Sequence, residues 1–156
     1  MVPRLVGVLA LAAVLVALAG CDEDSPVAGS RERALERAAM AAGDACHRDA
    51  AGAVPNATIV HDCGRGIAAA RGIEANQRKA FMSQNVLDGT SEILALELFT
   101  RGIAEVRLKH IAAAQADLRE SRTRAEGIVA RKTLSAESLA QLDALLQDVA
   151  AMKVPR

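Results

Sequence analysis

Four side chains that can bind a metal or form a disulfide lie in two short pairs on either side of a proline. Cys46 and His47 are adjacent, and His61 lies two residues before Cys63. If the segments on the two sides of Pro55 form a helical hairpin, the pairs meet at facing helix ends. Two thiolates and two imidazoles would complete a tetrahedral zinc site or a copper site. A Cys46–Cys63 disulfide is the simpler interpretation, and we expect it if the chain is exported.

Two further patterns bear on cofactors. Residues 43–47, GDACH, are similar to the covalent haem attachment motif CxxCH, but Gly43 stands where the first cysteine should be. His110 continues an apolar stripe, where a histidine is usually a core or boundary residue with a satisfied hydrogen bond. We therefore predict no cofactor and no metal, with His47, His61 and His110 as the residues that would bind a metal if one were held.

The sequence contains no recognisable catalytic set. HExxH, GxSxG and a phosphate-binding glycine loop do not occur, so we do not expect an enzyme. A basic stretch near the C-terminal third is interpreted as a solvated helix face, with anionic lipid or an acidic partner as the alternative. Its cations are Arg119, Arg122, Arg124, Arg131 and Lys132.

The N-terminus carries the most specific signal. One positive charge at Arg4 precedes an uncharged run over 5–20, which ends in Leu18, Ala19, Gly20 and Cys21. These are the parts of a secretory signal, and the run is short for a spanning helix, which needs about 20 residues. The ending resembles the lipobox of bacterial lipoprotein precursors. That resemblance implies removal of 1–20 and acylation of Cys21, which would be the membrane contact of the mature chain.

The residues after the cysteine bear on location. Asp22 and Glu23 follow it directly, and 21–30 has the composition of a flexible acidic tether. In the lipoproteins of enteric bacteria, an aspartate at this position with an acid beside it is an inner-membrane retention signal. By this resemblance the mature protein would stay on the periplasmic face of the inner membrane.

Composition excludes several classes of partner. Arg4 is the only charged residue of 1–20, so the mature chain has a net charge of −1, which gives no electrostatic argument for nucleic acid. Phe81 and Phe99 are the only aromatic residues, so stacking platforms for bases or sugars are missing. No small-molecule substrate is evident, and a protein partner in the cell envelope is the favoured expectation.

The 34 alanines and scarce β-branched runs predict an all-α protein with one helical domain over 31–156. Helices are expected over 31–51, 59–87, 91–132 and 136–152, with a turn at 88–92. Gly64, Gly66 and Gly72 weaken the second helix, or instead permit its close approach to the first helix. Short connections favour a small antiparallel bundle, or a helical hairpin plus a long helix.

These observations predict a membrane-anchored periplasmic lipoprotein that acts by binding another protein. It would be an adaptor in an envelope complex, or an inhibitor or immunity-type partner of a toxic enzyme. The alternative is a periplasmic carrier that binds a metal or haem through its histidines.

Overall fold

The protein is all-α, as the sequence predicted. The computed structural model describes residues 29–52 and 54–152, apart from the side chains of 29–36, 39 and 40. Every regular element in this part of the chain is an α-helix. The elements are α2 (Gly29–Ala51), α3 (Asn56–Lys79), α4 (Gln84–Arg107), α5 (Ile111–Arg131) and α6 (Ala136–Ala151).

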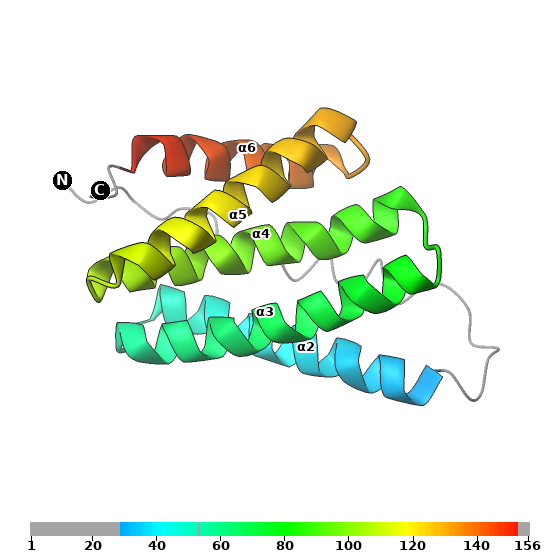
Figure 1. The fold of residues 1–156 in the computed structure, drawn as a ribbon, viewed down its shortest axis with the longest axis horizontal. Helices are drawn as coiled ribbons and strands as arrows, with labels where there is room; N and C mark the ends of the chain where they lie inside the picture. Colours follow the sequence, from blue (N-terminus) through cyan, green and yellow to red (C-terminus); the bar gives the residue numbers. More distant parts are fainter. Residues whose placement is uncertain (1–28, 53, 153–156) are drawn as a thin grey trace.

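The helices are stacked in the order of the sequence (Figure 1). Successive helices run antiparallel through connections of three or four residues, and each packs mainly on its neighbours in the chain. α4 lies centrally, between α3 and α5, and it also makes smaller contacts with α2 and α6. The result is an open array of antiparallel helices, because α2 and α6 lie at its two ends.

The predicted helix over 59–87 and the predicted turn at 88–92 are both wrong. α3 ends at Lys79, and 88–92 lies inside α4. The chain reverses at 80–83, where Phe81 adopts a left-handed backbone with φ 54°. The polar residues that suggested a turn are instead held by other helices: for example, the Thr90 hydroxyl donates to Gln77 Oε1 at 2.8 Å.

The long helix expected over 91–132 is also wrong. Leu108, Lys109 and His110 separate α4 from α5, and Lys109 has a φ of 64°. This connection contains neither glycine nor proline, so composition gave no signal for it. The fourth predicted helix agrees with α6, and Ser135 caps it as expected, since its hydroxyl oxygen accepts from the Ser138 N–H at 3.2 Å.

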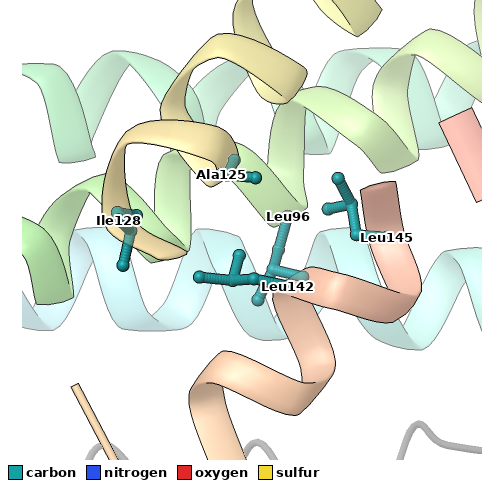
Figure 2. Packing of buried hydrophobic residues seen from close by; sticks show 6 residues of the cluster. Leu96, Ala125, Ile128, Leu142 and Leu145 are labelled. Carbon is teal, nitrogen blue, oxygen red and sulfur yellow. The ribbon is translucent and has the colours of Figure 1, made fainter. Parts of the chain in front are cut away.

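The largest apolar cluster lies where α6 covers α4 and α5. Figure 2 shows leucines of α6 directed toward the other two helices. The members of the cluster are Ala95, Leu96, Ala125, Ile128, Leu142 and Leu145. Because these residues come from three helices, α6 is fixed to the array by aliphatic packing.

The other half of the array has a smaller core. Ile67 and Ala70 of α3 pack with Leu94 and Leu98 of α4, while the cysteines form a separate cluster with Ile59 and Ala104. None of the helices described by the structure is both long and apolar enough to cross a bilayer.

Candidate functional site

The expected disulfide is present. The Sγ atoms of Cys46 in α2 and Cys63 in α3 are 2.05 Å apart, and both residues are fully buried. They pack on Ile59 and Ala104, close to the connection between the two helices. The bridge therefore joins α2 covalently to α3 at one end of the array.

The three histidines are placed separately. His61 is exposed, and its Nδ1 lies 2.8 Å from Asp62 Oδ1. His110 is not on an apolar stripe: it is the N-cap of α5, it is largely exposed, and its Nδ1 lies 2.6 Å from Glu105 Oε2. Burial lowers the pKa of His47, and the nearby Asp44 carboxylate opposes this effect.

These positions bear on the metal-site alternative. The disulfide takes both sulfurs that would have been thiolate ligands. Within the described ranges, no three His, Cys, Asp or Glu side chains gather closely enough to hold a metal ion.

Glu97 is the most unusual group of the array. Its side chain is fully buried, and neither carboxyl oxygen has a hydrogen-bond partner in the structure. The carboxyl lies against Gly43 of α2 and Gly66 of α3. A Cβ on Gly66 would lie 2.5 Å from Glu97 Oε1, and a Cβ on Gly43 would lie 2.8 Å from the same atom. Gly66 thus permits a close approach, but the approaching group is a side chain of α4 and not the first helix that the sequence suggested.

The surroundings of Glu97 favour its neutral form. Burial raises its pKa to about 8, although the charge of Arg101 acts in the opposite direction. Arg101 is itself engaged, because its guanidinium donates two hydrogen bonds of 2.7 Å to Asp117. At neutral pH the array therefore contains a protonated carboxyl in a space made by two glycines.

A set of ion pairs joins α5 to α3 and α4. Arg131 donates to both oxygens of the buried Asp88 at 2.6 and 3.0 Å. Arg124 reaches Glu74 of α3 at 3.2 and 3.3 Å and the Ser91 hydroxyl of α4 at 3.0 Å. The prediction of a solvated basic face is therefore wrong for the half-buried Arg124, whereas Arg131 is exposed while it pairs with Asp88.

The same ion pairs line an open polar groove of about 340 Å³. Burial would raise the pKa of Asp88, but hydrogen bonds from Arg131, Thr133 and Gln84 hold it below its ordinary value. Glu74 shows the same balance. Burial alone would raise its pKa, but Arg124 and Arg78 hold the pKa below its ordinary value. Because the charges of the groove neutralise one another across helices, their direct effect is to fix how the helices pack.

Two exposed apolar residues lie in the α3–α4 connection. Phe81 is 92% exposed and Met82 is 45% exposed, and both lie within the helix that the sequence predicts over 59–87. The left-handed backbone of Phe81 directs its side chain away from the core clusters. Neither its exposure nor its conformation could be read from the residue type.

The N-terminal predictions lie outside the described residues. Cys21, Asp22, Glu23 and the proposed signal over 1–20 all fall within 1–28. Comparisons with protein-family models, with curated proteins and with solved structures found no match to this chain.

Proposed function

We propose that the protein is a membrane-anchored periplasmic lipoprotein whose helical array binds a protein of the cell envelope. The observation that carries the proposal is that the three cysteines have different positions and roles. Cys21 ends an uncharged, lipobox-like run, and the other two form the disulfide. Disulfides persist in exported proteins and are rare in reducing compartments. A lipid on the first cysteine and a bridge between the others together suit an exported lipoprotein.

The open array supports the part of the proposal that concerns a protein partner. α2 and α6 end the stack, so each has a face that no other helix among residues 29–52 and 54–152 covers. Several buried ionisable groups of α4 are committed to neighbouring helices, as in the Asp88–Arg131 pair. Such an arrangement offers shape and extended surface for recognition, as in other proteins that stack helices in sequence order.

Mass spectrometry of the N-terminal peptide tests the anchor. The peptide that begins at Cys21 should carry a diacylglyceryl group and an acylated amine, and Cys21→Ala should leave an unprocessed precursor. Cys63→Ala is the matched control, since it removes a cysteine but should keep the lipid. A normally sized, lipid-bearing product from Cys21→Ala would exclude the lipobox interpretation.

Fractionation of inner and outer membranes tests the proposed location of the protein. Replacing Asp22 and Glu23 together by serine should move the protein toward the outer membrane in a bacterium that sorts lipoproteins as enteric bacteria do. An unchanged distribution would exclude the retention signal while leaving the anchor untouched.

Photocrosslinking in living cells tests the partner. A photoreactive residue is placed at one exposed position on each of four helices, namely Asp44, Ala68, Ala116 and Ala144. We expect a discrete adduct from one face and none from the opposite face. The absence of a discrete adduct at all four positions, with stoichiometric metal in the purified protein, would favour the carrier function instead.

A further inference from the structure

The connection between α3 and α4 lies at the end of the array where the tether is attached. α2 and α3 contain 23 and 24 residues, and they are closed at one end by the 52–55 connection and the disulfide. Because the two helices are antiparallel and similar in length, the start of α2 and the end of α3 share the other end. Figure 1 places both ends on the right of the view.

The length of the tether limits how far this end can be from the lipid. Seven residues separate Cys21 from Gly29, the first residue of α2, so eight Cα-to-Cα steps join them. A fully extended chain of that length spans at most about 27 Å. α2 adds about 35 Å before the disulfide-closed end is reached. The 80–83 end is therefore the end of the α2–α3 hairpin that stays within reach of the bilayer.

This end presents the side chains that enter a membrane surface most readily. Phe81 and Met82 are adjacent and exposed, whereas the remaining exposed large hydrophobic residue of the described part, Val54, lies at the opposite end. Exposed cations lie nearby: Lys79 ends α3, and Lys132 follows α5. The Arg131–Asp88 pair holds the end of α5 against the first turns of α4. Basic residues beside inserted apolar residues favour anionic headgroups.

We propose that Phe81 and Met82 insert into the bilayer that holds the lipid of Cys21, so that the array stands on the membrane by its 80–83 end. The inference rests on the proposed lipid anchor and adds an orientation to it. The lipid supplies the attachment, and it raises the effective concentration of the 80–83 connection at the surface. Two contacts fix a direction that one attachment cannot fix, and they direct the 52–55 end away from the membrane.

Fluorescence provides the test, because the chain contains no tryptophan and no tyrosine. Phe81→Trp introduces a single indole at the proposed contact, and Val54→Trp is the matched control at the other end. The acylated chain is placed in phosphatidylcholine vesicles that contain phosphatidylglycerol and brominated lipids. We expect a blue shift and strong quenching for the indole at position 81 and neither for the one at position 54. Equal, weak quenching at both positions would overturn the proposal.

Two further arms separate the contact from the anchor. A chain beginning at residue 21 with Cys21→Ser carries no lipid, and its vesicle binding should fall about tenfold when Phe81→Ser and Met82→Ser are added. Circular dichroism verifies that the helices remain. Unchanged binding would overturn the contact even if acylation of Cys21 is demonstrated. An indole at position 81 that stays in water on vesicles, but is buried in native membranes, would assign this surface to a protein and also overturn the proposal.

Discussion

Replacing Glu97 by glutamine should make the protein more stable at neutral pH and should flatten its dependence on pH. The wild-type carboxyl is fully buried without a hydrogen-bond partner, so Glu97→Gln removes no bond present in the structure. Glutamine has a similar length and cannot ionise. The variant therefore isolates the cost of keeping a titratable group in the space between Gly43 and Gly66.

The magnitude follows from the two pKa values. In the folded protein burial raises the pKa of Glu97 to about 8, against 4.5 for an ordinary glutamate. As the pH rises above 4.5 the unfolded chain loses this proton while the folded chain retains it, so the free energy of unfolding falls. The slope is about 1.4 kcal/mol per pH unit, and it ends near pH 8, where both states are ionised. The loss reaches about 3 kcal/mol at pH 7 and about 4 to 5 kcal/mol at pH 8.

Other carboxyl groups also make the free energy of unfolding depend on pH, and their contributions can be distinguished from that of Glu97. Burial also raises the pKa of Glu92, partly opposed by a Ser138 hydrogen bond, so a smaller slope of the same sign should persist in Glu97→Gln. Glu74 and Asp88 have lowered pKa values. Their contribution is complete above the ordinary carboxyl range and is lost as the pH falls below it. His47 contributes a slope of the opposite sign in the interval from pH 5 to 8, because burial lowers its pKa. These contributions are shared by wild type and Glu97→Gln, so the difference between the two proteins reports on Glu97.

The assay is urea unfolding, monitored by circular dichroism at helical wavelengths. It is repeated at about pH 5, 6, 7 and 8, which covers the interval in which Glu97 titrates differently in the folded and unfolded chains. We expect the curves of Glu97→Gln and wild type to diverge with rising pH, with the variant more stable. Glu126→Gln is the control, because it makes the same change at a half-exposed carboxylate on α5. Parallel wild-type and Glu97→Gln curves over this interval would refute the reasoning.

Four other substitutions test the packing. Gly66→Ala should destabilise by about 1 to 3 kcal/mol, since its Cβ would overlap the Glu97 carboxyl, whereas Gly72→Ala, with open space around it, should stabilise by about 0.5 to 1 kcal/mol in the same urea assay. Cys46→Ser should reduce hydrogen-exchange protection in α2 and α3 while the α4–α6 cluster stays protected; uniform protection would contradict the separate cores. Arg131→Gln leaves the buried Asp88 carboxylate without its cation, and should destabilise by about 2 kcal/mol at pH 7 but less below pH 4, as Asp88 becomes protonated.

Helical structure could be predicted from the sequence, but two of the four connections between helices could not. Alanine content and a proline-containing segment were enough to place α2 and the start of α3. The DGTSE stretch looked like a turn because its residues favour turns in isolation. In the structure Asp88 and Thr90 find partners on α5 and α3, and such long-range hydrogen bonds leave no local signature.

The breaks that do occur were hidden for the opposite reason. Phe81 and Lys109 carry the left-handed backbone that glycine usually supplies. Gly43 and Gly66, meanwhile, lie inside helices, where they make room for Glu97. The disulfide could be predicted because the two cysteines lie on either side of a proline-containing break, where a helical hairpin would bring them together. The buried carboxyl could not, since acidic residues on helices are ordinarily solvated.

The position of the disulfide has a mechanical consequence. A chain held at its N-terminus and pulled through a bound partner would be stretched first where α2 begins, at Gly29. If α2 peels away, the chain can lengthen only as far as Cys46, where the bridge passes the force directly to Cys63 in α3. The covalent loop between the two cysteines then carries no tension, so the residues between them add nothing to the length that the pulled chain can gain. Beyond α2, further extension would have to begin in α3 after Cys63, so the cross-link hides the α2–α3 connection from the force.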